Sequence, residues 1–277
     1  MATFARHGFT TLLKATNLTQ FLPVPESDLP PGASANAAAL RTICEELGPT
    51  FIKLGQIAST RSDLLPKEYL EELRKLQDSA MPVDHLLIRQ VIEEELGEVP
   101  EALFASFEEE PRAAASLGQV HGAMLKDGSQ VVLKVQRPGV VERITSDLEI
   151  LKSVALWIDR HSEIGKKYDL PGVVEDFSTT LVSELSYMRE GRNAERLSKN
   201  LKSDTDTRAF YIPKVHWEFT TDRVICWEEL VGWKIEEIDE AEKQGIHRSD
   251  LARDFMNGYL QQIFIDGYYH ADPHPGN

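Results

Sequence analysis

The pattern of apolar residues changes at about Leu103, and this change constrains the fold more than any other feature of the sequence. Between residues 36 and 96 the apolar residues recur at the three- and four-residue spacing of helices. Prolines, which favour helix entrances and exits, punctuate this region at positions 49, 66, 82 and 100. The pattern predicts roughly four helices with short connections.

After Leu103 the sequence indicates β-structure. Val120–Leu125 and Val131–Gln136 are rich in β-branched and alternating residues, and Lys126–Ser129 between them contains Asp-Gly, a strong hairpin signal. A second pair of strands is predicted in Ile212–Phe219 and Arg223–Leu230. The sheet is therefore expected to be antiparallel.

Helical periodicity returns in three places within and after this β-region. We predict helices over Val140–His161, from Val173 to about Leu201, and from Ser249 as N-cap onward, the last with an apolar stripe that includes Leu251 and Phe255. Helices and an antiparallel sheet in one chain indicate an α+β fold.

Composition excludes several classes of protein. The 30 Lys and Arg against 45 Asp and Glu give a formal charge of −15, which argues against a general nucleic-acid coat. The only cysteines, Cys44 and Cys226, are far apart and fit neither a disulfide framework nor a thiolate zinc site. With no apolar run of spanning length and no signal peptide, we expect a cytoplasmic protein.

The most informative motif is His270–Asn277, which has the spacing H-x-D-x-x-x-x-N directly after a predicted helix. This is the spacing of kinase-like catalytic loops, in which the Asp orients or deprotonates the attacking hydroxyl and the Asn holds a phosphate-bound Mg²⁺. Asp272 and Asn277 are the candidates here. Zinc is the weaker reading, because His270 and His274 lie in a proline-containing loop and not on one helix face.

Lys134 and the turn before its hairpin are a second candidate for nucleotide chemistry. Lys134 lies in the strand where a kinase-like fold places the lysine that contacts the α- and β-phosphates. The turn Ala113–Gln119 is built of small residues that let backbone N–H groups approach phosphates, although it has alanines where a kinase has glycines.

Two glutamates, Glu184 and Glu190, are candidates to neutralise Lys134. Both lie in the helix predicted from Val173 to about Leu201, and residues six apart on a helix do not face the same point, so only one is expected to pair with it.

The segment Lys53-Leu54-Gly55-Gln56 has the form K-x-G-Q. Lys53 and Gln56 are three residues apart and share a helix face, whereas Gly55 costs about 1 kcal/mol relative to alanine within a helix. We therefore expect another part of the chain to lie against the backbone at Gly55.

Together these motifs resemble, in order, those of the UbiB-type atypical kinase-like family, also called the aarF-domain kinases. The resemblance extends from Leu47 to Asn277. It implies a protein-kinase-like two-lobed fold with these segments: residues 1–35, an N-terminal segment and linker; 36–102, a helical extension with K-x-G-Q; 103–231, a small lobe with an inserted helix; and 232–277, the start of an incomplete large lobe.

The resemblance also implies roles for individual residues. Lys134 would contact phosphates, Glu190 would pair with it, and Asp272 would be the catalytic base or water-orienting group, with Asn277 on magnesium. Glu184, together with Lys53, Gly55 and Gln56, would belong to a regulatory cover. The nucleotide itself would be bound by Ala113, Ala114, Ala115, Ser116, Gln119 and the hinge glutamate Glu228.

The chain departs from the family at Ser186, because the family has E-x-D where this sequence has Glu184-Leu185-Ser186. The change removes a carboxylate that in the family helps to bind metal or to restrain K-x-G-Q. The regulation of this protein is therefore expected to differ from that of the family.

The activity implied by the resemblance is that of an atypical kinase or ATPase that binds ATP and Mg²⁺ and supports isoprenoid quinone (ubiquinone-type) biosynthesis. Its expected partners are quinone-like lipid intermediates or quinone biosynthesis proteins, with peripheral contact at the inner face of a membrane and no nucleic acid. The alternative is a non-catalytic nucleotide- or lipid-binding scaffold of a biosynthetic complex, which has no chemical need for Lys134, Asp272 and Asn277. An ordinary protein kinase is disfavoured by the alanine-rich turn.

A kinase-like fold also needs a D-F-G aspartate shortly after the catalytic loop. The sequence stops at Asn277, so we expect it to be partial and inactive by itself.

Overall fold

The computed structural model describes residues 33–62, 65–77, 81–162, 169–202 and 210–271. Most of the expected N-terminal segment lies outside these ranges, as does the end of the catalytic loop. The described chain combines helices with one antiparallel sheet and divides into two compact units built from non-contiguous segments.

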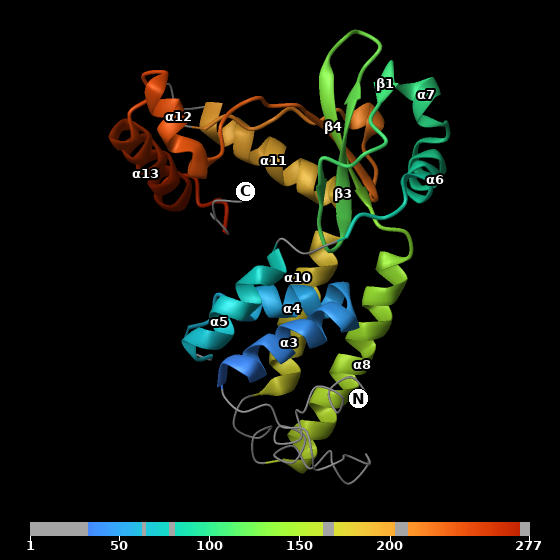
Figure 1. Ribbon diagram of the computed structural model, residues 1–277, viewed down its shortest axis with the longest axis vertical. Helices are drawn as coiled ribbons and strands as arrows, with labels where there is room; N and C mark the ends of the chain where they lie inside the picture. Colours follow the sequence, from blue (N-terminus) through green and yellow to red (C-terminus); the bar gives the residue numbers. More distant parts are fainter. Residues whose placement is uncertain (1–32, 63–64, 78–80, 163–168, 203–209, 272–277) are drawn as a thin grey trace. The chain divides into compact units, whose positions relative to one another are not determined.

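The first unit comprises residues 1–91, 109–121 and 135–185. Its helices pack on one another (Figure 1): α3 (Ala33–Leu47), α4 (Pro49–Ala58), α5 (Lys67–Arg74), α8 (Val140–His161) and α10 (Leu170–Glu184). One apolar core lies under α3, α4 and α5 and is formed by Cys44, Leu73 and Leu76. A second core joins α8 to α10 through Ile144, Leu148, Phe177 and Leu181.

The second unit comprises residues 92–108, 122–134 and 186–277. Its elements include α7 (Pro100–Leu103), β1 (Ser106–Phe107), α11 (Tyr187–Lys202), β5 (Val224–Glu228), α12 (Ile238–Lys243) and α13 (Arg248–Phe264). Tyr187 of α11 is buried against Val215 and Ile225, and this cluster holds the helix to the strand. The helix α6 (His85–Leu96) belongs to both units.

The sheet has the order β1-β3-β4-β5, with β2 (Ala113–Ala114) also paired to β3 (Gly118–Met124). The predicted hairpin between β3 and β4 (Gln130–Gln136) is confirmed. It turns at Gly128, whose φ of 90° is a left-handed conformation that glycine adopts without strain. Buried residues alternate along β4, with Val131, Leu133 and Val135 fully buried.

The helix predictions for the N-terminal half are confirmed. Four helices, α3 to α6, lie between residues 33 and 96, and α8 has the predicted bounds Val140–His161. Pro49 starts α4 and Pro66 precedes α5, as expected for a residue that lacks an N–H and is tolerated only at a helix start.

Three predictions for the C-terminal half need correction. The helix predicted from Val173 to Leu201 is two helices, α10 and α11, separated at Leu185 and Ser186. The strand predicted over Ile212–Phe219 is reduced to a single bridge between Val215 and Trp227, followed by a 3₁₀ turn at Trp217–Phe219. The hydrogen bonds of His216 N to Cys226 O and Glu228 N to Lys214 O still place this segment beside β5.

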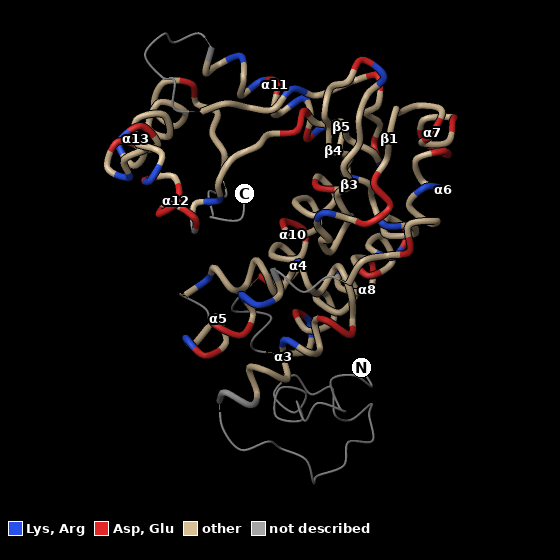
Figure 2. The backbone as a smooth tube through the Cα atoms, turned by 45° about the horizontal axis from the view of Figure 1, so that its top comes forward, with Lys and Arg blue, Asp and Glu red and all other residues tan. Residues whose placement is uncertain are grey.

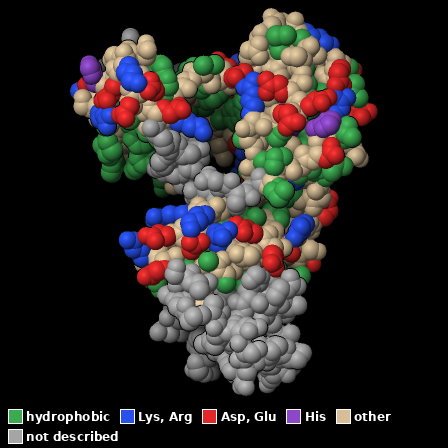
Figure 3. Space-filling view, viewed as in Figure 1, with side chains coloured by type: hydrophobic (Ala, Val, Ile, Leu, Met, Phe, Trp, Pro, Cys, Tyr) green, Lys and Arg blue, Asp and Glu red, His purple; other side chains and the backbone are tan. Residues whose placement is uncertain are grey.

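The third correction concerns α13. It begins at Arg248 with His247 as N-cap, two residues before the predicted N-cap Ser249. Its predicted apolar stripe is half exposed, with Leu251 at 38% and Phe255 at 42%, whereas Gln261 and Gln262 are buried. Hydrophobic side chains accordingly gather on the surface over this helix (Figure 3).

Charged residues of both signs are intermixed along the helices, so that the net negative charge is spread over many elements (Figure 2). No helix within the described ranges is both long and apolar enough to cross a bilayer.

Candidate active site

The predicted ion pair between Lys134 and Glu190 is present in the second unit. The Lys134 Nζ on β4 donates to both carboxylate oxygens of Glu190 on α11, at 3.1 and 2.9 Å. It also lies 4.7 Å from the centroid of the Tyr187 ring, a cation–π geometry. The two charged side chains are 33% and 38% exposed. The ammonium is therefore fixed in place but still reachable by a ligand.

The break between α10 and α11 explains how Glu190 reaches this position. Ser186 caps α11, because its Oγ accepts a hydrogen bond from the N–H of Arg189 at 3.3 Å. The same hydroxyl donates to Asp222 Oδ1 at 2.7 Å, and the Asp222 carbonyl accepts from Tyr187 N at 3.1 Å. The residue that departs from the family pattern thus starts the helix that bears Glu190.

The K-x-G-Q segment lies on α4 in the first unit and pairs with Glu184. Lys53 Nζ lies 2.8 Å from Glu184 Oε2, with side chains 24% and 33% exposed. Gln56 Nε2 donates to the carbonyl of Leu76 at 3.0 Å. The two glutamates therefore serve two different lysines, as the resemblance implies.

The close approach expected at Gly55 is confirmed. A Cβ added there would lie 2.5 Å from Leu76 Cδ1 and 3.4 Å from both Cys44 Sγ and Leu73 Cδ2. These three residues form the core under α3, α4 and α5. Gly55 therefore allows α4 to lie close to its neighbours, and a larger residue there would require Leu76 to shift.

The alanine-rich turn connects β2 to β3 in the first unit. Ala113 pairs with Val120 and Ala114 with Gln119, and Ala115 N donates to Gly118 O at 2.8 Å across the turn. Ala115 is exposed, whereas Gln119 is completely buried. Of the residues expected to bind nucleotide, those at the tip of the turn are accessible and Gln119 is not.

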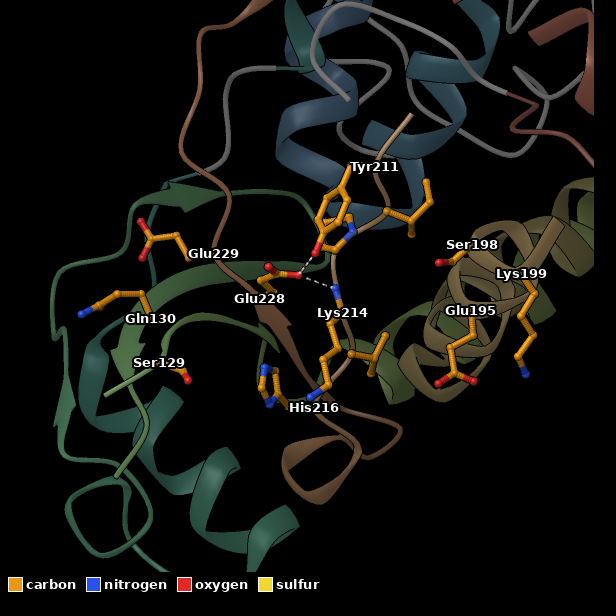
Figure 4. Close-up of a pocket in the computed structure, with 13 residues that line it drawn as sticks. Ser129, Gln130, Glu195, Ser198, Lys199, Tyr211, Lys214, His216, Glu228 and Glu229 are labelled. Atoms are coloured by element: carbon orange, nitrogen blue, oxygen red, sulfur yellow. Dashed lines mark hydrogen bonds between the residues drawn. The ribbon is translucent and has the colours of Figure 1, made fainter. Parts of the chain in front are cut away.

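Glu228 lies in the second unit at the end of β5, where its carboxylate is already engaged. Its Oε2 accepts from the Tyr211 hydroxyl at 2.6 Å and from Lys214 N at 3.0 Å (Figure 4). These bonds to the charged form, first that from Tyr211, lower the pKa of Glu228 below its ordinary value. Tyr211 in turn has a raised pKa, because its proton is held by the carboxylate.

Glu228 also lines a cavity of about 630 Å³ together with residues of α11, the segment 211–216 and the start of β4 (Figure 4). Neither Lys134 nor Glu190 is among its lining residues. The structure thus brings Lys134 and Glu190 together, but it places Glu228 in a different environment.

Asp272 and Asn277 lie outside the described residues. The start of their loop is described, and α13 fixes it: Gln262 Oε1 accepts from His270 N at 3.1 Å, and the Tyr259 hydroxyl donates to His270 O at 2.7 Å. Gln262 is only 2% exposed. Among the described residues, no three His, Cys, Asp or Glu side chains converge to form a metal site.

Sequence reasoning missed several residues that shape these sites. Tyr187, Tyr211 and Gln262 were not singled out, although each contacts a candidate residue or its loop. Only Gln262 carried a signal, since two adjacent glutamines within a largely apolar helical stretch are unusual. Arg137, which lies three residues after Lys134, was also missed.

Comparison with known proteins agrees with the arrangement of these motifs. Residues 75–277 match the ABC1 atypical kinase-like domain. The chain is 45% identical over 231 residues to an uncharacterized protein of Synechocystis, covering 83% of this chain and 39% of that protein. It is 41% identical over 241 residues to the Protein ACTIVITY OF BC1 COMPLEX KINASE 7, chloroplastic, of Arabidopsis thaliana, covering 87% and 34%.

A bacterial relative matches almost the whole chain. The Probable protein kinase UbiB of Cellvibrio japonicus is 37% identical over 277 residues, covering 99% of this chain and 50% of that protein. The chain thus spans between about a third and half of the length of these relatives.

A solved structure supports the fold. The complex of Rv3197 with erythromycin from Mycobacterium tuberculosis has a TM-score of 0.57 and 30% identity, covering 87% of this chain and 60% of that one. The predicted α+β, kinase-like fold class is confirmed. The chain belongs to the ABC1 atypical kinase-like family, of which the UbiB proteins are members.

Proposed function

We propose that this chain forms the nucleotide-binding part of an atypical kinase or ATPase that uses Mg-ATP. The observation that carries the proposal is the pairing of Lys134 with both oxygens of Glu190 above the Tyr187 ring. A lysine held by a carboxylate from a neighbouring helix is the arrangement by which kinase-like enzymes direct an ammonium group toward phosphates.

The Lys134–Glu190 pair is better explained by ligand binding than by its contribution to stability. A partly exposed ion pair contributes little to stability, about 0–1 kcal/mol. Here the pair is supported by a second contact, because the Tyr187 ring lies under the ammonium and is itself 1% exposed. Fixing a partly solvated ammonium in this way has more value for binding phosphate than for folding.

We assign the remaining roles by the resemblance. The tip of the turn, the exposed Ala115 and the partly buried Ser116, would offer backbone N–H groups to the nucleotide, and Glu228 would mark the hinge. Asp272 would orient or deprotonate the attacking group, and Asn277 would hold magnesium. When bound, Mg-ATP supplies the phosphoryl group for transfer to water or to an acceptor.

We further propose that the whole protein supports isoprenoid quinone biosynthesis at a membrane surface. This proposal follows from the resemblance to UbiB proteins and from the relatives named UbiB. Quinone-like lipid intermediates or quinone biosynthesis proteins would then be its partners.

The nucleotide proposal is tested in the full-length protein by measuring the melting temperature with and without Mg-ATP. A ligand that binds the folded form raises stability, by about 2.7 kcal/mol at a ligand concentration 100 times Kd. We expect a shift in the unmodified protein and a much smaller one in Lys134→Met. No shift in either protein would contradict nucleotide binding.

A turnover assay then separates the enzyme from the scaffold. A positioned general base contributes roughly 10²- to 10⁴-fold. We therefore expect Asp272→Asn to reduce ATP turnover by this factor while nucleotide binding stays measurable. Nucleotide binding without turnover in the unmodified protein would instead favour the non-catalytic scaffold.

A further inference from the structure

The alanine-rich turn is tied to a segment within the helical extension by two side chains that have no role in the proposal above. The segment Met81–Val83, which leads into α6, is held by Arg137 at one residue and by Gln119 at another. All of these residues belong to the first unit. All of these contacts therefore lie within one compact unit.

Arg137 bridges two backbone segments with one guanidinium group. Its Nε donates to Ala115 O at 2.9 Å, and its Nη2 donates to Met81 O at 2.6 Å. Its backbone N–H also donates to Leu117 O at 2.9 Å. Because guanidinium donors are rigid and coplanar, the two carbonyls have a fixed separation. Partial burial lowers the pKa of Arg137, but arginine remains charged at any ordinary pH.

Gln119 joins the same segments through its side-chain amide. Its Oε1 accepts from Val83 N at 2.8 Å, and its Nε2 donates to Val83 O at 3.2 Å. The amide thus pairs with the backbone of Val83 as a neighbouring strand would. Nε2 also lies 3.0 Å from His121 Nε2, and both side chains are completely buried. A buried amide is costly to leave without its partners, so this contact is hard to break.

The turn is also anchored from its other side. Leu117 packs against the core that joins α8 to α10. The backbone of the turn is therefore restrained at Ala115, at Leu117 and at Gln119, and two of these three restraints lead to Met81–Val83. A displacement of Met81–Val83 must move the turn or break these bonds.

We propose that Arg137 and Gln119 are positioning residues that couple the segment Met81–Val83 of the helical extension to the alanine-rich turn, so that this segment determines where the turn meets the nucleotide. This inference rests on the proposed nucleotide site. It assigns Gln119 an indirect role through the turn, in place of direct contact with nucleotide.

Arg143 provides a matched control. Its Nη2 donates to the carbonyl of Leu47 at 2.8 Å and so joins α8 to the end of α3 by the same chemistry, guanidinium to backbone carbonyl. The contact lies in the same unit but does not involve the turn. Arg143→Ala should cost comparable stability without changing the turn.

The coupling itself is tested by hydrogen exchange in the full-length protein without nucleotide. We expect Arg137→Ala to accelerate exchange of the amides of both Val83 and the turn 115–118, and Arg143→Ala to accelerate neither. Exchange that rises in the turn alone, or equally in both variants, would overturn the coupling. If Arg137→Ala does not fold, Arg137→Lys keeps the charge but loses the two-carbonyl fork, and the same comparison applies.

The functional consequence is tested by the Kd and KM for Mg-ATP. Coupling between sites typically changes affinity by roughly 5- to 150-fold. We expect Arg137→Ala to raise both constants by roughly tenfold with a smaller change in kcat, and Arg143→Ala to match the unmodified protein. Equal constants in the two variants would reduce Arg137 to a purely structural role. If the unmodified protein binds no Mg-ATP, the proposed function fails, and the exchange result still decides the coupling.

Discussion

Each unit contains a lysine–glutamate pair of nearly the same length, yet the two pairs are built differently. Lys53 and Glu184 meet in the first unit at 2.8 Å, between two helices. Lys134 and Glu190 meet in the second at 2.9 Å, between a strand and a helix, with both carboxylate oxygens engaged and an aromatic ring below the ammonium. The difference suggests that the first pair restrains helices, whereas the second orients a charge.

The separation of the two pairs depends on the interruption at Ser186. On one continuous helix, the two glutamates would be fixed relative to each other. Since α10 ends at Glu184 and Ser186 caps α11, each glutamate belongs to a different unit and serves its own lysine. One capping residue thus makes two roles possible within a short stretch of sequence.

The largest expected effect distinguishes the two glutamates. In the full-length protein we expect Glu190→Gln to lower Mg-ATP turnover by roughly 10²-fold, the scale for one preorganised electrostatic contact in a site, because Lys134 loses its charged partner. Glu184→Gln should change turnover by less than about tenfold, since Glu184 forms its ion pair with Lys53 and not with the proposed phosphate-binding lysine.

The measurement is steady-state ATP hydrolysis, and the control is Lys152→Met. Lys152 forms an exposed pair with Glu175 at 2.9 Å, so its loss should leave turnover unchanged. Equal losses in Glu190→Gln and Glu184→Gln would show that the pairs do not differ in function.

A smaller effect, on the free energy of unfolding, is expected at two tightly packed glycines, one in each unit. A Cβ at Gly191 would lie 2.8 Å from Trp217 Cη2, and Trp217 is held by a 2.6 Å hydrogen bond to Glu195. We expect Gly191→Ala to destabilise the protein by about 1–3 kcal/mol, because a rigid ring gives way less readily than a leucine methyl.

Gly55→Ala should cost less, about 1 kcal/mol or below, since the flexible end of Leu76 can shift and alanine favours the helix. Urea unfolding of both variants measures the difference. A larger loss at Gly55 would mean that the first unit is the more rigidly packed of the two.

The smallest effect concerns the two thiols, again one in each unit. Burial raises the pKa of Cys44 to about 11 and that of Cys226 to about 12, so both are protonated at pH 8 and react only when the structure opens. Cys44 is 7% exposed and Cys226 is fully buried.

We therefore expect a thiol reagent to label Cys44 first in the folded protein and both cysteines at equal rates in denaturant. Raising the pH above the unfolded value of 9.0 should weaken the fold, because only the unfolded thiols ionise readily. Faster labelling of Cys226 would show that the second unit opens more easily.

Local patterns in the sequence predicted most of the fold. The Asp-Gly hairpin, the bounds of α8 and the proline-marked starts of the early helices all depend on neighbouring residues. The break at Ser186 could not be predicted in this way, because helical periodicity continues through it and its partner Asp222 is 36 residues away. The strand predicted over Ile212–Phe219 was wrong at its end for a related reason, since alternation alone does not exclude the 3₁₀ turn at Trp217–Phe219.

The candidate site was predictable to a similar extent. Lys134, Glu190 and Glu184 could be named from motifs, and their partners are those the resemblance implies. That Gln119 would turn inward to Val83, and that Arg137 would join two carbonyls, depends on contacts between distant segments. Spacing within a motif carries no information about such contacts.

The exposed apolar face of α13 has a practical consequence for work with these 277 residues alone. Phe264 and Ile265 are 79% and 77% exposed and lie close to Met256 and Leu260, which are about half exposed. An exposed apolar surface of this kind promotes self-association and adsorption to vessel walls. The apparent molar mass from light scattering should therefore rise with protein concentration, and mild detergent should reverse the effect.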